Sequence, residues 1–262
     1  MSTERLAKEL RRLRDRRYRG HDLPEDRAVF ARTLGLEPDP WQERLLRSDA
    51  DRVLLNASRQ AGKSTMVAVL SVHTALVEPG ALVLLLSPTL RQSSELFKKC
   101  AGLYRGAGRP VAAESETALT LTLGNGSRIV SLPGKEASVR GFSAVSLLVV
   151  DEAARVPNDL YVSVRPMLAV SGGRLVALST PFGTRGWWYE AWRSQEAWDR
   201  YEVPATEVLR IRPEFLEEER RTLGAWWFEA EYMCRFLDAQ TQAFTREEVD
   251  KAFTEEVEAW AL

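Results

Sequence analysis

VLLNASRQAGKST, residues 53–65, is the stretch of sequence that decides the fold. The apolar run Val53–Leu55 ends at a loop of small and polar residues, the loop ends in Gly62-Lys63-Ser64-Thr65, and apolar residues then recur at helical spacing from Met66. A strand, a small-residue loop and a helix in this order are the context that a phosphate-binding P-loop requires. The backbone N–H groups of residues 60–64 would surround a phosphate at the positive end of the helix. The stretch therefore predicts a P-loop.

Side chains of this loop have specific expected roles. Lys63 would reach the β- and γ-phosphates of a nucleotide, and the hydroxyl of Ser64 would hold Mg²⁺. The P-loop pattern asks for glycine where this chain has Ala57. Because alanine tolerates a positive φ less well than glycine does, we expect the loop to start with a slightly different backbone. A turn that merely caps a helix is the alternative interpretation.

Ser146–Glu152, read as SLLVVDE, is the second informative stretch. Its apolar residues predict a buried strand, and Asp151 and Glu152 follow at the carboxyl end, where open α/β sheets bind ligands. Asp151 would hold Mg²⁺, and Glu152 would orient the attacking water or accept its proton. Two acids after a strand can also simply start a loop. Together with the P-loop they predict an ATPase, with Lys63 and the acids converging from the ends of two neighbouring buried strands.

Composition sets the remaining bounds. The chain has 262 residues, 45% of them hydrophobic and 28% charged, with a net charge of −1, as in an ordinary soluble globule. It contains no apolar run of about 18 residues and no apolar signal core at its start, so we expect neither a membrane span nor secretion. Cys100 and Cys234 are far apart in sequence, and we expect reduced structural thiols. A locally basic face remains compatible with this balance.

The rest of the chain fits an α/β fold. Residues 81–86, 146–150 and 174–179 are apolar runs of strand length, which is typical of a parallel sheet covered on both faces. Residues 119–123 and 128–132 alternate around Gly124–Ser127, which predicts a hairpin, and residues 201–205 are a candidate edge strand. Helices are expected over residues 4–18, 90–103, 213–223 and 225–237. We divide the chain into a basic helical arm (1–36), a P-loop core (37–200), a small C-terminal helical lid subdomain (201–240) and a linker region (241–262).

Several residues outside the two main motifs are further candidates. Trp41 and Gln42 precede the P-loop, where Gln42 would pair with adenine while Trp41 packs nearby; a core tryptophan in a proline-initiated helix is the alternative. Arg140, beside Gly141, is a candidate arginine finger, or else an exposed loop arginine. Ser179 and Thr180 end a strand on the predicted catalytic side, where they would sense the γ-phosphate or only cap the strand.

Basic residues after the second predicted strand are candidates for DNA contact. They are Lys98, Lys99, Arg105 and Arg109. Surface solubility explains such residues equally well.

Taken together, these motifs resemble the ATPase domain of the large terminases, the DNA-packaging motors of tailed bacteriophages. The resemblance runs from about Pro38 to Leu237 and rests on Trp41-Gln42, Ser58–Thr65, Arg140-Gly141, Leu147–Glu152 and Ser179-Thr180-Pro181. It implies an additional-strand, RecA-like P-loop ATPase with a mostly parallel sheet flanked by helices. It also implies ATP and Mg²⁺ as cofactors, double-stranded DNA as substrate, the small terminase subunit as partner, and a homo-oligomeric ring on the portal of a procapsid in the host cytoplasm.

The resemblance also assigns roles to residues. Nucleotide contacts are implied for Ser58, Gln60, Ala61, Gly62, Lys63, Ser64 and Thr65, and coupling of hydrolysis to motion for Ser179 and Thr180. Arg59, inside the loop, would stabilise transition-state charge in its own subunit. We place Arg140 ahead of Arg59 as the finger, because a residue on a separate glycine-hinged loop can report the arrival of a neighbouring subunit.

One feature departs from the family pattern. Large terminases usually continue into a C-terminal nuclease domain of ribonuclease H type, whereas about twenty residues follow the expected linker here. We therefore expect a truncated chain without nuclease activity. The alternatives to a packaging motor are a helicase-like DNA translocase and an ATP-gated assembly scaffold with negligible turnover.

Overall fold

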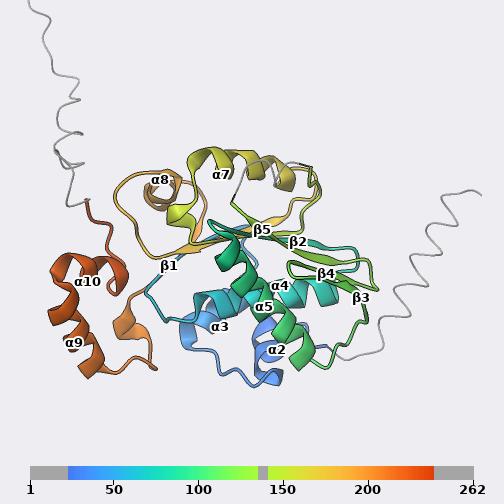
Figure 1. Cartoon of the computed structure of the whole chain (residues 1–262), viewed down its shortest axis with the longest axis horizontal. Coiled ribbons are helices and arrows are strands. Elements are labelled where there is room, and N and C mark those ends of the chain that lie inside the picture. The colour runs from blue at the N-terminus through green and yellow to red at the C-terminus, as the bar shows by residue number, and fades with distance from the viewer. Residues whose placement is uncertain (1–22, 135–140, 239–262) are drawn as a thin grey trace, which may run out of the picture.

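An eight-stranded sheet forms the centre of the protein, as seen in a computed structural model that describes residues 23–134 and 141–238 (Figure 1). The strand order is β3-β4-β5-β2-β6-β7-β1-β8. The strands are β1 (Arg52–Ala57), β2 (Leu82–Ser87), β3 (Ala113–Glu116), β4 (Thr120–Leu123), β5 (Arg128–Pro133), β6 (Leu147–Asp151), β7 (Arg174–Ser179) and β8 (Asp199–Val203). Six of them, from β5 to β8 in this order, pair in parallel, and β3-β4-β5 pair antiparallel. The predicted fold class, an α/β protein with a mostly parallel sheet, is confirmed.

Helices cover both faces of the sheet. They are α2 (Arg27–Thr33), α3 (Pro40–Arg47), α4 (Lys63–Val77), α5 (Leu90–Gly106), α7 (Asn158–Val164), α8 (Trp187–Arg193), α9 (Pro213–Leu223) and α10 (Ala225–Glu231), with short 3-10 helices η1 (Ala153–Arg155), η2 (Arg165–Leu168) and η3 (Ala205–Glu207). Helices α2–α5 lie on one face, and α7 and α8 lie on the other (Figure 1).

Alternation along β1 shows why two layers form. Val53 and Leu55 pack into the hydrophobic cluster that includes α4, whereas Leu54 packs into the cluster that includes α7 and α8. Successive strand residues point to opposite faces, so a continuous apolar run is stable when both faces are covered. This accounts for the apolar runs in the sequence.

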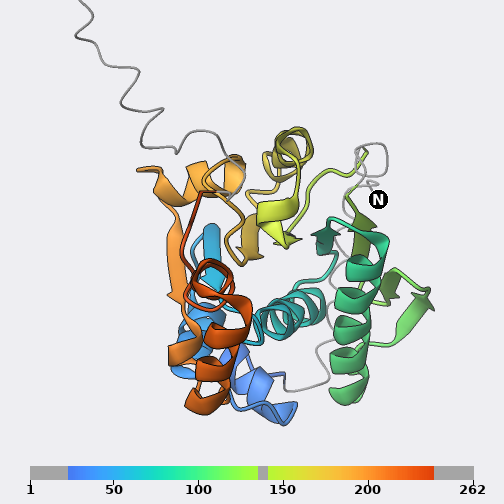
Figure 2. The same ribbon diagram turned by 60° about the vertical axis from the view of Figure 1, so that its left-hand side comes forward.

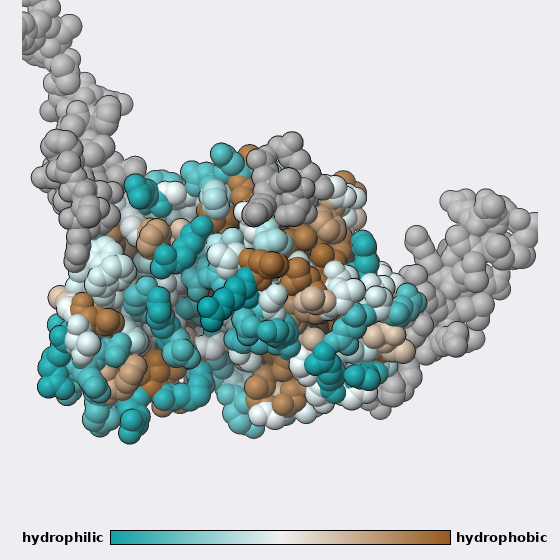
Figure 3. All heavy atoms as spheres, viewed as in Figure 1, coloured by the Kyte–Doolittle hydropathy of each residue, from teal (hydrophilic) through white to brown (hydrophobic). Residues whose placement is uncertain are grey.

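A small C-terminal unit is attached to the β8 edge. Strand β8 takes the first residues of the expected lid subdomain (201–240), so from here on we use the name lid subdomain for residues 204–234. This segment contains α9 and α10 and has its own apolar cluster of Ala205, Leu216, Phe228 and Tyr232. Figure 2 shows α9 and α10 beside β8, at the end of the sheet opposite to α5. Hydrophilic residues predominate over the lid subdomain in Figure 3, with a few hydrophobic ones among them. The division of the whole chain into domains remains a prediction.

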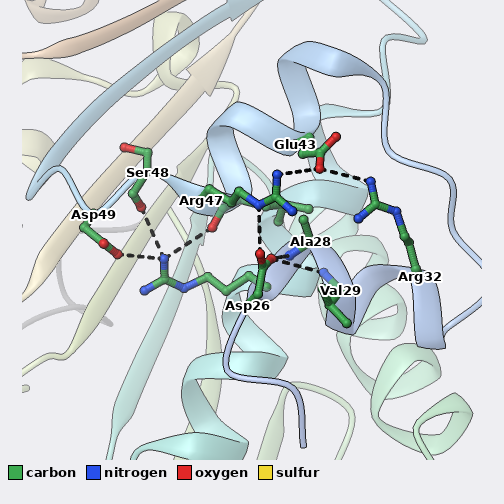
Figure 4. Close-up of polar contacts among 10 residues, drawn as sticks. Asp26, Ala28, Val29, Arg32, Glu43, Arg47, Ser48 and Asp49 are labelled. Carbon is green, nitrogen blue, oxygen red and sulfur yellow. Dashed lines mark hydrogen bonds and ion pairs between the residues drawn. The ribbon is translucent and has the colours of Figure 1, made fainter.

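Ion pairs fix α3 against α2 (Figure 4). Arg47 contacts Asp26 at 2.8 Å and Glu43 at 2.6 Å, and Arg32 contacts Glu43 at 3.0 Å. Asp26 also caps α2 by accepting hydrogen bonds from the N–H groups of Ala28 and Val29. The network is largely exposed, so each pair contributes little free energy. Its consequence is geometric, because α3 places its first turn beside the P-loop.

The structure corrects three details of the sequence prediction. The strands that carry the loop and the acids, β1 and β6, are not neighbours, because β7 lies between them. Strand β3 was not predicted and extends the hairpin to an antiparallel trio. Helix α10 ends at Glu231 rather than at residue 237.

Other predictions fall beyond the described ranges. The basic arm over residues 4–18, Arg140, and the linker from residue 241 all lie outside the described residues. In the part of the chain that is described, no helix combines the length and the apolar character needed to cross a membrane.

Candidate active site

The loop between β1 and α4 has the backbone of a P-loop. Gln60 and Gly62 have positive φ values of 61° and 91°. The positive φ of Gly62 favours glycine, and a Cβ atom there would lie 2.8 Å from Nε2 of Gln42 and displace that amide. Ala57 is the last residue of β1, is buried, and is absent from the positive-φ residues. Alanine is therefore accommodated at this position without a positive φ, and the expected difference from a glycine-containing loop start remains a prediction.

Lys63 is buried at the start of α4 and turns back on its own loop. Its Nζ donates hydrogen bonds to the carbonyl oxygens of Ala57 at 2.6 Å and Ser58 at 2.8 Å. Burial lowers the pKa of Lys63, while the charges of Glu152 and Asp151 oppose that shift. The ammonium group is thus held by carbonyl groups of the loop and interacts electrostatically with both acids.

The two acids stand at the carboxyl end of β6. Burial raises the pKa of Asp151 to about 6, Glu152 adds to the increase, and Lys63 opposes it. Oδ1 of Asp151 accepts a hydrogen bond from the N–H of Glu152 at 3.1 Å. Glu152 itself has φ of 51°, a left-handed conformation that is uncommon outside glycine. Because β1 and β6 run parallel in one sheet, their carboxyl ends bring the loop lysine and the acids to the same edge of the sheet. Their convergence on one nucleotide remains a prediction.

Ser179 and Thr180 lie at the end of β7, between the loop strand and the acid strand. Both side chains are buried. Oγ of Ser179 accepts a hydrogen bond from the N–H of Ala154 at 3.2 Å, so its hydroxyl is linked to the segment that follows the acids. Contact of either residue with a γ-phosphate remains a prediction.

Gln42 lies directly against the loop. Its Nε2 donates to the carbonyl of Ala61 at 3.0 Å, and its Oε1 accepts from the N–H of Asp39 at 2.9 Å. Arg210 of the lid subdomain donates to the same Ala61 carbonyl at 3.2 Å and pairs with Asp39 at 2.8 Å. Trp41 is buried in the core cluster beneath them. The adenine roles of Gln42 and Trp41 remain predictions.

Arg59 is bound by an acid that the sequence did not mark. Its Nε and Nη2 donate to the two carboxylate oxygens of Glu231 at 2.9 and 3.2 Å, and its N–H donates to the Glu231 carbonyl at 3.1 Å. This pair raises the pKa of Arg59. Glu231 occupies an ordinary-looking position in an aromatic-rich helix, so no local pattern distinguishes it. A role for Arg59 toward nucleotide remains a prediction, as does the finger role of Arg140.

The candidate DNA-contacting residues are all exposed, on α5 and the turn after it. Two of them are paired with acids, Lys98 with Glu95 at 2.8 Å and Arg105 with Glu116. These contacts fit a solvated helix face, and DNA binding by Lys98, Lys99, Arg105 and Arg109 remains a prediction.

The donor set beside Lys63 suits magnesium. Ser64 supplies a hydroxyl at the loop, and Asp151 supplies a carboxylate at the end of the acid strand. Mg²⁺ is usually held by one or two carboxylates together with water and substrate phosphates. Within residues 23–134 and 141–238 there is no cluster of three or more His, Cys, Asp or Glu side chains able to hold a metal.

A P-loop at the end of β1, an acid pair at the end of β6 and a strand between them define a P-loop NTPase fold of the additional-strand, RecA-like type. A family model described as terminase large subunit, T4likevirus-type, N-terminal, matches residues 54–251. The chain therefore belongs to the terminase large subunit family.

Relatives and solved structures agree with this assignment. The chain is 24% identical over 259 residues to the large terminase subunit of Thermus virus P23-45, covering 85% of the chain and 53% of that protein. It thus spans about half the length of the curated relatives it matches. The large terminase ATPase domain of Thermus phage P74-26 is 24% identical with a TM-score of 0.71, covering 80% of this chain and 98% of that one. The large terminase of a thermophilic bacteriophage, solved in complex with ADP, is 15% identical with a TM-score of 0.66, over 76% of this chain and 54% of that one.

Proposed function

We propose that the chain is the ATP-hydrolysing motor domain of a viral large terminase, which translocates double-stranded DNA into a procapsid. The observation that carries the proposal is that the parallel strands β1 and β6, on either side of β7, bring Lys63, Asp151 and Glu152 to the same carboxyl edge of the sheet. A large terminase of similar fold has been solved in complex with ADP and with ATP-gamma-S, which supports a nucleotide as the ligand.

The residues of this chain divide the chemistry among them. The loop N–H groups and Lys63 bind the phosphates, for which Lys63 exchanges the Ala57 and Ser58 carbonyls for phosphate oxygens. Ser64 and Asp151 would hold Mg²⁺, which would supply positive charge against the phosphates. Glu152 orients the attacking water and accepts its proton.

A second positive charge completes the site in this proposal. Arg140 of a neighbouring subunit acts as the finger in a homo-oligomeric ring on the portal, and Arg59 acts within its own subunit. The small terminase subunit is the further partner, and the host cytoplasm is the place of action. Ser179 and Thr180 couple hydrolysis to motion. Lys98, Lys99, Arg105 and Arg109 are the candidate contacts for DNA.

Replacing Glu152, the proposed base, tests the proposed ATPase function directly. Glu152→Gln should abolish ATP turnover and leave binding of ATP-gamma-S within about threefold of wild type, because the amide keeps the shape of the side chain but accepts no proton. Asp159→Asn, an exposed change in α7, is the control. A scaffold that only binds ATP would turn over equally slowly with and without the substitution.

The dependence of turnover on protein concentration tests the ring. Turnover per chain should rise with concentration in wild type and stay low in Arg140→Ala, because the finger acts between subunits. Equal turnover per chain at all concentrations would remove Arg140 from the site.

A further inference from the structure

Arg155 joins three segments of the candidate active site. It is the last residue of η1, which begins directly after Glu152. The Cζ atom of its guanidinium lies 4.2 Å from the centre of the Phe182 ring, and its Nη2 lies 3.8 Å from Oε1 of Glu231. Arg155 belongs to the acid segment, Phe182 follows Ser179-Thr180-Pro181 at the end of β7, and Glu231 belongs to the lid subdomain.

Glu231 connects the same point to the P-loop. Its carboxylate accepts both hydrogen bonds of the Arg59 side chain, and only 8% of its side chain is exposed. Because a buried carboxylate needs compensating positive charge and hydrogen bonds, Glu231 holds Arg59 and Arg155 on one side of the lid subdomain. The loop, the acid segment and the end of β7 therefore share one contact point on the lid.

The backbone of η1 connects Arg155 to Glu152, the proposed base. The left-handed conformation of Glu152 is strained and persists only if its surroundings enforce it. The N–H of Arg155 donates to the Glu152 carbonyl at 2.8 Å, and the N–H of Ala154 donates to Ser179. Anchoring the Arg155 side chain between Phe182 and Glu231 fixes the far end of the turn that enforces this conformation.

We propose that Arg155 is a positioning residue that holds Glu152 in its working conformation and ties that conformation to the lid subdomain through Phe182 and Glu231. This inference rests on the proposed function, since it assigns Arg155 a part in the action of Glu152. The Arg155 side chain points to an aromatic ring and a lid carboxylate, and it acts on hydrolysis without binding nucleotide. Movement of the lid changes the Glu231 contact and thereby the position of the base.

We expect substitution of Arg155 to lower ATP turnover without weakening nucleotide binding. Arg155→Ala should lower kcat about 10- to 100-fold, because a small misplacement of a catalytic group has effects of that size. The Kd for ATP-gamma-S should change less than about threefold, since no phosphate contact is lost. Arg155→Lys, which keeps a cation over the ring, should recover most of kcat. Phe182→Leu, which keeps apolar bulk without the aromatic face, should reproduce part of the loss.

Hydrogen exchange measures the effect on the lid subdomain independently of ATP turnover. Hydrogen exchange of residues 204–234 should change on addition of ATP-gamma-S in wild type, and this response should be lost in Arg155→Ala. Arg165→Ala is the matched control, because Arg165 also stacks on an aromatic ring, Tyr161 of α7, at 5.6 Å and is paired there rather than with the lid. It should leave kcat and the exchange response unchanged.

The outcomes separate this inference from the proposed function. If Glu152→Gln loses turnover while Arg155→Ala keeps wild-type kcat and the wild-type exchange response, the inference is wrong and the motor proposal stands. A parallel loss of kcat and ATP-gamma-S affinity in Arg155→Ala would make Arg155 a nucleotide ligand and also overturn it. If Glu152→Gln turns over normally, the proposed function fails, and the role of Arg155 fails with it.

Discussion

Replacing Asp151 by asparagine should stabilise the nucleotide-free protein. Asp151 is buried at the end of β6, and burial with the neighbouring Glu152 raises its pKa from the ordinary value of 3.8 to about 6. Near neutral pH the folded protein therefore keeps a carboxylate ionised in a place that favours its neutral form. Asparagine has nearly the same shape, still accepts the hydrogen bond from the Glu152 N–H, and carries no charge.

The size of the effect follows from the pKa. A pKa raised to about 6 corresponds to about 3 kcal/mol of unfavourable free energy in the ionised state. The buried amide loses part of this gain through its own desolvation, so we expect about 1–2 kcal/mol net. For a chain of this size, that is a rise in Tm of roughly 2–8 °C.

The raised pKa of Asp151 also determines how the stability difference between the two proteins varies with pH. Between about pH 4 and pH 6 the folded protein binds more protons at Asp151 than the unfolded chain does, so the free energy of unfolding falls as pH rises through this window. Near pH 4, where this penalty on wild type is absent, Asp151→Asn should be about 1–2 kcal/mol less stable than wild type because of the amide desolvation. Its relative stability should rise up to about pH 6, where it exceeds wild type, and stay constant above that pH.

Thermal unfolding of nucleotide-free protein at several pH values, with Asp159→Asn as an exposed control, measures this difference. In the same assay ATP-gamma-S with Mg²⁺ should stabilise wild type but have much less effect on Asp151→Asn, because a metal ligand is lost. An Asp151→Asn protein less stable than wild type at about pH 8, or a difference that does not vary with pH, would refute the reasoning.

Three further substitutions probe the loop, the lid and the core. Gly62→Ala should cost about 1–3 kcal/mol and weaken nucleotide binding, because its φ is 91° and its methyl would meet the Gln42 amide; wild-type melting and affinity would contradict this. Glu231→Ala should speed hydrogen exchange in the lid subdomain and leave that of the sheet unchanged. The loss of stability should stay below about 1 kcal/mol, because Arg59 is mostly exposed. Hydrogen exchange in the lid subdomain equal to that of wild type would count against the Arg59 contact. Burial lowers the pKa of His73, so wild type should lose stability as pH falls through about 6.5. The variant His73→Gln, which keeps a donor for the Pro24 carbonyl, should lose less stability over the same range. Parallel stability profiles of the two proteins would contradict this role of His73.

The elements that sequence predicted well are those fixed by local chemistry. The P-loop needs a small-residue turn before a helix, and Gly62 meets both its conformational and its steric demand. The strands β1, β2, β6 and β7 are visible as apolar runs, because both faces of a central parallel strand are buried. The acid pair is recognisable because it follows such a run directly.

Contacts between distant parts of the chain were not predictable in this way. The position of β7 between β6 and β1 depends on how helices pack over the sheet, and no local pattern encodes it. The pairing of Arg59 with Glu231 spans 172 positions in the sequence. Trp41 illustrates a third case, because burial in the core and contact with a base both favour an aromatic residue at that position.

The attachment of the lid subdomain has a mechanical consequence. The chain leaves β8 beside Ser58, whose N–H binds the Val203 carbonyl, and returns beside Asn56, whose amide binds the Cys234 carbonyl at 2.9 Å. Entry and exit are thus hinged on the same few residues of β1, immediately ahead of the phosphate loop. The two ends of the lid subdomain are therefore held side by side at the residues that lead into the phosphate loop, so a displacement of α9 or α10 would act first on that part of the chain.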